Sequence, residues 1–467
     1  MSQTIIENTF DSPLDSSWDV RKLGYLRKLS LLMFDMAGII LCFYFSTRLR
    51  GLEFYFEHYI FWCVAGILLL SFYILDLYRL DIELRALGIS LRIFMALLLS
   101  FIGIISLSFI LGQQRWYGQY FGRGIMPLSL FSFWIYTFGT RAFAFRSYSK
   151  KLKSLKLLLI GKKESFENFF EDLKVLPCEV SFSLISDSPP YSLPKKVTYL
   201  DDINYDTFSY SGVVFNSDAK DESLMKQLMA LRLRGVRIYT LSDFYEIFWF
   251  KVPINDLKEA WFAINEGFHL LHSKIGQRIK RAFDIFLSLV ILIISLPICL
   301  LTGILITLTD KGPIFYTQWR KGLAGENFKI FKFRSMKVEA EKNGAVWASK
   351  KDDRITWIGN IIRKTRIDEI PQVLNVLKGD MSFIGPRPER PEFTQMLEKE
   401  IPFYDLRHLV KPGITGWAQV NYPYGASVED AKEKLMYDLY YIKNFSIFLD
   451  FSIVLKTIRI LLLGKGR

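Results

Sequence analysis

The run IRKTRIDEIPQVLNVLKGDMSFIGPRPERPEF occupies residues 362–393 and brings charged residues, glycines and prolines together in a short space. Apolar residues recur at helical spacing between positions 370 and 377, and Gly379 follows them as a residue suited to ending a helix. Pro371 is tolerated in a first helical turn. The pattern therefore predicts a short helix that begins just after Asp368.

Asp368 has two interpretations on this local pattern. As the residue before a helix, it could cap free backbone N–H groups, which stabilises a helix by about 1 kcal/mol. The same helix start attracts phosphate, and Arg363 and Arg366 precede Asp368 and Glu369 within one short segment. Two acids beside two cations suit Mg²⁺-assisted attack on a diphosphate. The local pattern alone favours the cap, and both interpretations stay open here.

Arg387 lies between Pro386 and Pro388, so its backbone is nearly fixed in an extended conformation. A rigidly held guanidinium can bind phosphate oxygens through two hydrogen bonds. A solvated arginine in a polar turn fits the pattern equally well. Asp380, with glycines on either side of it, suits a loop that closes on a charged ligand.

Two further cations lie upstream, where Lys332 and Arg334 alternate with Phe331 and Phe333. Alternation of this kind predicts a half-buried strand, here with a basic outer face. A solvated face is the simpler interpretation, and binding of phosphate or substrate is the functional one.

Composition narrows the class of protein. Apolar residues make up 51% of the 467 residues and are clustered, which indicates membrane spans. The net charge of +13 suits anionic lipid or a polyphosphorylated ligand, and with long apolar segments present we expect lipid rather than nucleic acid as the partner. The four cysteines and four histidines are too scattered for a zinc cluster or a disulfide framework, so any metal should be oxygen-bound.

The N-terminal part predicts a membrane domain. Residues 1–24 read as a cytoplasmic tail, and residues 25–148 hold four apolar segments, each near the roughly 20 residues of a spanning helix. Basic residues flank the first and last segments, which predicts that both ends are cytoplasmic. A buried helical bundle in a soluble protein is the alternative. The four segments are residues 29–47, 56–77, 88–112 and 125–143.

Residues 149–256 predict a small parallel α/β domain, because strand-like runs alternate with helical ones. The turn after the first strand, Gly161-Lys162-Lys163-Glu164, lacks the glycine pattern of dinucleotide-binding folds. We therefore expect a Rossmann-like domain without a nucleotide, followed by a linker over residues 257–278.

The last region, residues 279–467, begins with an apolar stretch that contains Pro297. If this stretch crossed the membrane, the basic domain after it would lie outside the cell, contrary to the distribution of charge. A proline kink permits a helix that enters the bilayer and returns, so we expect a re-entrant helix over residues 279–309. The terminal helix, with Lys456 and Arg459, suits the membrane interface, although a core helix is the alternative.

Together these segments resemble the bacterial sugar transferases, the monotopic phosphoglycosyl transferases that act on polyprenyl phosphates. Transmembrane helices and an α/β domain ahead of the catalytic domain are similar to the large branch of that family. The resemblance lies in KRAFD (280–284), GPIFYTQWRKG (312–322), FKFRSM (331–336), DDRIT (352–356), the run at 362–393, KPGITGWAQV (411–420) and YDLYYIKN (437–444).

The resemblance implies a mechanism. Asp368 would attack the β-phosphate of a UDP-hexose and release UMP, and undecaprenyl phosphate would then accept the hexose 1-phosphate from the aspartyl intermediate. Glu369 and Mg²⁺ belong to the same centre, with Asp368 and Glu369 as candidate ligands. Arg363 and Arg387, with Pro386 beside it, match positions that contact phosphate. The family also implies the bacterial inner membrane, a catalytic domain facing the cytoplasm, and a role in starting exopolysaccharide, capsule or O-antigen synthesis.

Several alternatives can be weighed. A nucleotide-sugar dehydratase or epimerase would need a glycine-rich NAD loop, which residues 280–467 lack, and many glycosyltransferases carry Asp-x-Asp, which the chain does not contain. A non-catalytic scaffold has no need of the motifs around Asp368 and Arg387. Glucose or galactose is the expected sugar, with an N-acetylated or modified sugar as the alternative, and phospholipids are expected partners. The sequence leaves the oligomeric state open, a homodimer included.

Overall fold

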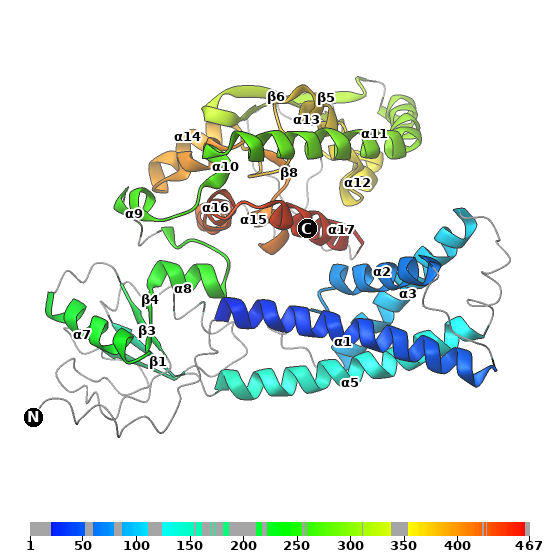
Figure 1. Cartoon of the computed structure of the whole chain (residues 1–467). Coiled ribbons are helices and arrows are strands. Elements are labelled where there is room, and N and C mark those ends of the chain that lie inside the picture. Colours follow the sequence, from blue (N-terminus) through cyan, green and yellow to red (C-terminus); the bar gives the residue numbers. More distant parts are fainter. Residues whose placement is uncertain are drawn as a thin grey trace, which may run out of the picture. The chain divides into compact units, whose positions relative to one another are not determined.

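The computed structural model describes most of the chain, in two compact units, Met1–Ile247 and Phe248–Arg467, which are treated separately below (Figure 1). The N-terminal tail before residue 20, the turn at 161–164 and the Asp352-Asp353 pair lie outside the described residues. The described residues are 20–51, 59–78, 86–110, 124–153, 156–160, 169, 172, 181–185, 212–216, 222–254, 257, 259–310, 312–337, 354–422, 425 and 427–462.

In the first unit, helices occupy the four predicted apolar segments: α1 (Val20–Leu49), α2 (Tyr59–Ile74), α3 (Ala86–Ile110) and α5 (Ile125–Lys153). α1 and α5 are joined by a buried ion pair between Asp35 and Arg141. Because isolated charges are costly away from water, such a pair fixes which helices lie side by side.

By length and composition, three helical stretches of the described residues could cross a membrane: Lys28–Leu49 in α1, Ile89–Leu107 in α3 and Lys274–Thr309 in the second unit. The protein is therefore membrane-associated. Of the four apolar segments predicted as spans in the first unit, α1 and α3 meet the criteria of length and composition among the described residues, whereas α2 and α5 do not. α2 is apolar but has only 16 described residues, and α5 mixes apolar side chains with hydroxyl groups and Arg141.

A parallel four-stranded sheet follows the helices in the first unit. Its strands are β1 (Lys156–Ile160), β2 (Ser181–Ile185), β3 (Gly212–Phe215) and β4 (Arg237–Thr240), in the order β2-β1-β3-β4. α7 (Glu222–Leu233) connects β3 to β4. The parallel strands agree with the α/β domain that the sequence predicts over residues 149–256. α8 (Leu241–Phe248) follows β4, and its last residue, Phe248, is the first of the second unit.

The second unit begins at Phe248, so it includes the segment expected as a linker. This segment contains α9 (Glu259–Ile264), α10 (His269–His272) and the start of α11 (Lys274–Asp310). The Phe268 N–H donates to the Lys443 carbonyl at 2.8 Å, and the Lys443 ammonium lies 4.3 Å from the centre of the Trp261 ring. The segment expected as a linker is therefore packed against the second unit.

After α11 the unit continues with the antiparallel hairpin of β5 (Phe315–Lys321) and β6 (Asn327–Phe333), then α12 (Trp357–Lys364) and α13 (Gln372–Lys378). A second pair, β7 (Ser382–Ile384) and β8 (Gly413–Thr415), is parallel. The other elements are η4 (Leu323–Gly325), η5 (Ile367–Glu369), α14 (Pro391–Glu400), η6 (Tyr404–Leu409), α15 (Trp417–Asn421), α16 (Val428–Lys443) and α17 (Ile447–Leu462).

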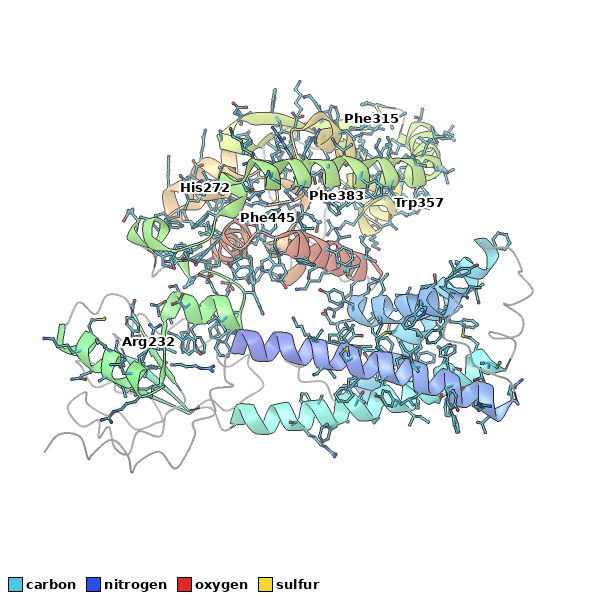
Figure 2. The ribbon with its side chains drawn as sticks, in the orientation of Figure 1. Arg232, His272, Phe315, Trp357, Phe383 and Phe445 are labelled. Atoms are coloured by element: carbon cyan, nitrogen blue, oxygen red, sulfur yellow. The ribbon has the colours of Figure 1, made fainter. Side chains whose placement is uncertain are left out.

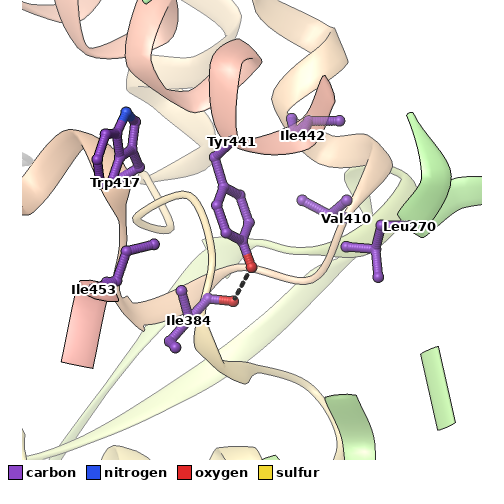
Figure 3. Close-up of a cluster of buried hydrophobic side chains, with 7 residues drawn as sticks. All are labelled: Leu270, Ile384, Val410, Trp417, Tyr441, Ile442 and Ile453. Atoms are coloured by element: carbon purple, nitrogen blue, oxygen red, sulfur yellow. Dashed lines mark hydrogen bonds between the residues drawn. The ribbon is translucent and has the colours of Figure 1, made fainter. Parts of the chain in front are cut away.

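Figure 3 shows one core of this unit, in which side chains from six elements or their flanks surround Tyr441. The Tyr441 hydroxyl donates to the Ile384 carbonyl at 3.4 Å and to the Asp450 carboxylate at 2.8 Å. Leu270 of the supposed linker belongs to the same cluster. A buried phenol with two acceptors locks the last two helices onto β7.

The motif KRAFD attaches α11 to this unit. Arg281 donates to the carbonyls of Val376 and Leu377 at the end of α13, the second at 2.7 Å. Asp284 accepts hydrogen bonds from the Ser382 hydroxyl at 3.0 Å and from the Phe383 N–H at 2.8 Å. The long apolar helix is thus joined by charged hydrogen bonds to the segment that follows Asp368.

Candidate active site

The backbone around Asp368 is a sequence of three short helices. α12 begins with the Thr356 hydroxyl accepting from the Gly359 N–H and ends at Lys364. Arg366 is left-handed, with φ of 60°, which reverses the chain into η5, where Asp368 lies. The next helix, α13, starts after Pro371 and ends at left-handed Gly379, with φ of 100°, as the sequence predicts.

The expectation that Asp368 caps a helix is wrong. The N-cap of α13 is Pro371, and within the described residues no side chain caps that helix. Asp368 is instead a middle residue of η5, 8% exposed, and its Oδ1 has no hydrogen-bond partner in the described part of the chain. The capping interpretation failed because the short helix η5 intervenes between the acidic pair and α13. The carboxylate is left available for chemistry.

Burial raises the pKa of Asp368, and the negative charge of Glu369 raises it further. Lys332, Arg363 and Arg366 oppose that shift. A carboxylate that is poorly solvated and poorly hydrogen-bonded is also a more reactive nucleophile than one held by several donors. The environment of Asp368 therefore suits attack on an electrophile.

Glu369 has the opposite environment. Its Oε1 lies 2.5 Å from Nη2 of Arg387, 3.1 Å from Nζ of Lys332 and 3.8 Å from Nη1 of Arg366. Burial would raise the pKa of Glu369, but Arg387, Lys332 and Arg366 together hold it well below the usual range. Adjacent carboxyl groups with divergent pKa shifts commonly have different roles, and here Glu369 collects cations beside Asp368.

Lys332 faces inward, which corrects the expectation of a basic outer face. On β6 it shares the side of Phe328 and Ile330, both buried. Burial lowers the pKa of Lys332, while Glu369 raises it. Alternation correctly predicts which residues share a face of the strand. It does not show that the face with Lys332 is the buried one, where Lys332 pairs with the Glu369 carboxylate on η5.

The GPRP loop (Gly385–Pro388) presents Arg387 on a firmly held backbone. Prolines lack N–H groups, so a loop built on them is fixed through its carbonyl oxygens. The Pro386 carbonyl accepts from the Gly413 N–H at 2.8 Å. The Arg387 carbonyl accepts from Nη2 of Arg407 at 2.9 Å, and the Pro388 carbonyl accepts from Nη1 of Arg320 at 3.1 Å.

Arg407 belongs to a buried network behind the loop. Its Nη2 lies 3.0 Å from Oδ2 of Asp438, and its Nη1 donates to the Tyr404 hydroxyl at 2.5 Å. Burial raises the pKa of Asp438 to about 6 against the opposing charge of Arg407. Sequence reasoning missed Arg407, Asp438 and Arg320. Arg320 and Asp438 lie in motifs that carry the resemblance and Arg407 lies outside them, and no local pattern shows that these side chains meet behind the loop.

The remaining predicted site residues are not all at this centre. Arg363 lies in the last turn of α12, close enough to lower the pKa of Asp368. Asp380 lies beyond the other end of α13, where its Oδ2 is 3.1 Å from Nζ of Lys378 and 3.4 Å from Nδ2 of Asn375. Arg334 is buried two residues beyond Lys332, against Gly312. The structure therefore brings together Asp368, Glu369, Lys332, Arg363 and Arg387.

The fit of this centre to Mg²⁺ depends on its oxygen atoms. Asp368 offers a buried carboxylate oxygen with no partner among the described residues, which suits a hard cation. The Oε1 of Glu369 is already surrounded by three cations. No cluster of three or more metal-ligating side chains occurs in the described residues. Mg²⁺ commonly takes one or two carboxylates and completes its shell with water and substrate phosphate, so Asp368 alone fits such an ion.

A reactive carboxylate ringed by arginine and lysine, in a unit carrying a long apolar helix, is typical of membrane-associated enzymes that act on phosphate esters. The family model for bacterial sugar transferases matches residues 275–464. The chain is 41% identical over 195 residues to the exopolysaccharide production protein PSS of Rhizobium leguminosarum bv. phaseoli, covering 40% of this chain and 98% of that protein. The chain belongs to the bacterial sugar transferase family.

Two longer relatives are similar to parts of the chain. A UDP-N-acetylgalactosamine-undecaprenyl-phosphate N-acetylgalactosaminephosphotransferase of Aeromonas hydrophila is 43% identical over 261 residues, which is 55% of this chain and 60% of that protein. A UDP-glucose:undecaprenyl-phosphate glucose-1-phosphate transferase of Escherichia coli (strain K12) is 39% identical over 188 residues, 40% of each chain. The similar region thus spans 60% or less of these two relatives.

Proposed function

We propose that this protein transfers a hexose 1-phosphate from a UDP-sugar to undecaprenyl phosphate and releases UMP. The observation that carries the proposal is the buried Oδ1 of Asp368, which has no hydrogen-bond partner among the described residues and lies beside cations that Glu369 holds in place. The names of the two longer relatives describe sugar-phosphate transfer to undecaprenyl phosphate, and the family model that matches residues 275–464 covers the site.

In the first step a carboxylate oxygen of Asp368 attacks the β-phosphorus of the UDP-sugar. A bond forms between that oxygen and phosphorus, the bond from the β-phosphorus to the bridging oxygen breaks, and UMP leaves with the electron pair. Arg387, Lys332 and Arg363 are fixed beforehand where negative charge accumulates, so they stabilise the transition state without reorganising. Mg²⁺, held by Asp368 and the diphosphate, would supply further charge neutralisation.

In the second step a phosphate oxygen of undecaprenyl phosphate attacks the phosphorus of the aspartyl intermediate. The new bond makes a lipid diphosphosugar, and the bond to Asp368 breaks, which regenerates its carboxylate. The covalent intermediate lets a water-soluble donor and a lipid acceptor use one site in turn. A product of this kind is suited to starting exopolysaccharide, capsule or O-antigen synthesis.

The membrane arrangement is part of the proposal. Arg281 and Asp284, near the start of α11, bind α13 and β7, while Ile306, near its end, packs against α12 and β6. If α11 crossed the membrane as a straight helix, its two ends would lie on opposite sides of a hydrocarbon core about 30 Å thick. Attachment of both ends to one unit, with Pro297 between them, supports a re-entrant helix whose catalytic unit faces the cytoplasm of a bacterial inner membrane.

Exposed apolar side chains support membrane contact by the second unit. They line α11 and occur on α17, and Trp357 on α12 is 74% exposed (Figure 2). Exposed apolar area on this scale marks an interaction surface, which here suits phospholipids. The parallel sheet of the first unit, with its order β2-β1-β3-β4, supports a Rossmann-like domain there. The exposed side chains of α11 include Ile293, Ile294, Leu300, Leu301 and Leu308.

The test of the nucleophile is Asp368→Asn in the full chain. We expect it to abolish UMP release while the protein still inserts into membranes. Mass spectrometry of the wild type mixed with UDP-sugar alone should find a phosphosugar on the peptide that contains Asp368. Asp405→Asn makes the same change at an exposed site on η6 and should leave turnover normal. Near-normal turnover by Asp368→Asn would refute the assignment.

The sugar is the open part of this proposal. The names of the two longer relatives contain glucose and N-acetylgalactosamine, so both unmodified and N-acetylated hexoses are candidates. Membranes should be incubated with undecaprenyl phosphate and, one at a time, the UDP forms of glucose, galactose and their N-acetylated counterparts. The donor that releases UMP fastest at equal concentration identifies the sugar.

A further inference from the structure

Arg334 is a buried cation whose charge has no partner in the described residues. The residue is 5% exposed, and all three side-chain nitrogens, Nε, Nη1 and Nη2, lack hydrogen-bond partners there. An arginine stays charged at any physiological pH, so it cannot relieve this cost by losing a proton. A buried guanidinium without an acceptor is destabilising, and natural folds retain such groups when a bound anion supplies the acceptor.

Arg334 lies near both the end of α11 and the segment that carries Asp368. Its N–H donates to the Ile314 carbonyl at 2.9 Å, and a side chain at Gly312 would overlap its guanidinium. α11 ends at Asp310, just before this glycine. The guanidinium does not cap α11, because its nitrogens have no acceptor in the described residues.

One apolar cluster connects the three parts. Ile306 of α11, Phe333 of β6 and Ile362 of α12 form its buried core, and Ile367 packs against it from η5. Ile367 precedes Asp368 in the chain, and Phe333 precedes Arg334. The end of the membrane helix, the unpaired guanidinium and the nucleophile are therefore held in one rigid neighbourhood.

Arg334 is also separate from the cations around Glu369. Arg334 lies just past the end of β6 at Phe333, two residues after Lys332, and two residues of extended chain place the Cα atoms about 7 Å apart. Lys332 binds Glu369, whereas Arg334 makes no such contact in the described residues. The site thus has two cationic positions, Lys332 on β6 and Arg334 just after the strand. Among the described residues, Arg334 has no hydrogen-bond partner for its guanidinium.

We propose that Arg334 binds the phosphate of the lipid acceptor, a polyprenyl phosphate monoester, and directs it at the aspartyl intermediate. A guanidinium binds phosphate through two parallel hydrogen bonds, and the exposed apolar side chains of α11, such as Ile304 and Leu308, give the polyprenyl chain a path to this point. The inference rests on the proposed function, since it assigns the acceptor in the second step.

In that step the bound phosphate acts as the nucleophile, so Arg334 holds two of its oxygens while the third is free to attack. That oxygen bonds to the phosphorus carried by Asp368, and the bond between Asp368 and phosphorus breaks with the electron pair returning to the carboxylate. The second ionisation of a phosphate monoester has a pKa of about 6, so no proton needs to be removed at neutral pH.

The experiment uses Arg334→Met in the full chain, reconstituted in vesicles. We expect a normal amount of phosphosugar adduct from UDP-sugar alone, followed by transfer to undecaprenyl phosphate at least tenfold slower than in the wild type. The guanidinium has no hydrogen-bond partner among the described residues, so the variant's Tm should equal or exceed that of the wild type. Arg334→Lys should recover part of the transfer rate, and Arg232→Met, exposed on α7 (Figure 2), is the matched control.

Stability gives a second measurement. Vesicles containing undecaprenyl phosphate should raise the Tm of the wild type but not that of Arg334→Met. Vesicles of phosphatidylglycerol alone should not raise either Tm, and an equal rise there would assign the site to a phospholipid headgroup and overturn the proposal.

The kinetic outcomes are also decisive. Normal transfer by Arg334→Met overturns the proposal, and so does a lower Tm, which would make Arg334 structural. Loss of the adduct at unchanged Tm would assign Arg334 to the donor phosphate instead. If the wild type itself forms no adduct with any UDP-sugar, the proposed function fails, and that result is independent of the variant.

Discussion

Replacement of Arg407 by methionine should slow sugar-phosphate transfer, although Arg407 does not contact Asp368 or Glu369 in the structure. Its guanidinium donates to the backbone carbonyl of Arg387 at 2.9 Å and pairs with Asp438 at 3.0 Å. The arginine and the aspartate are 6% and 2% exposed at their side chains. Arg407→Met therefore removes the hydrogen bond that fixes one side of the GPRP loop and leaves a buried carboxylate behind.

The expected effect of Arg407→Met has two parts, a loss of folding stability and a loss of transfer rate. Removal of one member of a buried ion pair costs about 3–5 kcal/mol of stability, whereas replacing both by apolar residues is often close to neutral. A displacement of a substrate-positioning group by about 1 Å costs about 100-fold in rate. We expect Arg407→Met to lose both stability and rate. The double variant Arg407→Met, Asp438→Leu should recover stability while its rate stays about 100-fold low.

The stability loss should depend on pH. Burial raises the pKa of Asp438 to about 6 even with Arg407 beside it, and removal of that cation raises the pKa further. A carboxyl group with a raised pKa in the folded state favours folding below its unfolded pKa and loses that contribution as pH rises through the folded value. Arg407→Met should therefore be less destabilising at pH 6 than at pH 8.

The assay follows UMP release at saturating donor together with unfolding by denaturant. Lys251→Met is the matched control, because Lys251 forms an ion pair at 2.5 Å with Glu433, on the same helix α16 as Asp438. It should lose stability without the selective loss of rate. A double variant at Arg407 and Asp438 with both normal stability and normal kcat would refute the positioning role.

The remaining predictions concern the acidic pair and the turn after it. Adduct formation by the wild type should rise with pH through the raised pKa of Asp368, since the carboxylate must be ionised to attack, and rapid quench at a series of pH values measures it. Glu369→Gln removes a negative charge that raises the pKa of Asp368. The low-pH rise of the rate of adduct formation should therefore move to lower pH in this variant. A rise at the same pH as in the wild type would contradict the effect of Glu369 on Asp368. Gly379→Ala places a side chain at φ of 100° and should cost about 1–2 kcal/mol, measured as a lower denaturant midpoint with the adduct still formed.

Local patterns predicted the backbone of the site better than its contacts. The helix α13 ends at Gly379 as expected, because a left-handed glycine is a strong local signal. The capping role of Asp368 was wrong, because a 3₁₀ turn, which has no clear sequence signature, separates it from α13. The parallel sheet agrees with the predicted α/β domain, because strand-like runs that alternate with helical ones indicate such a domain.

Long-range contacts were not predictable from the residues that make them. Arg407 and Asp438 are 31 positions apart. The residues around each of them do not indicate that the two side chains pair or that Arg407 holds the backbone of Arg387. Lys332 was placed on the wrong face, because alternation does not show which face meets η5. The segment expected as a linker over residues 257–278 is packed into the second unit through Leu270, with Phe268 and Leu271 beside it, and no local pattern shows which helices these side chains meet.

The charged groups of the site differ in whether the protein itself supplies their partners. Glu369 is surrounded by cations and is already neutralised, whereas Asp368 and Arg334 are buried with unpartnered polar atoms in the described residues. These two groups have opposite charges and lie in one neighbourhood, yet they do not pair with each other. Unpaired buried charges destabilise the free protein, so their partners should arrive with the substrates. A phosphoryl group bound to Asp368 and a lipid phosphate bound to Arg334 would satisfy both at once, in the arrangement that the second step requires.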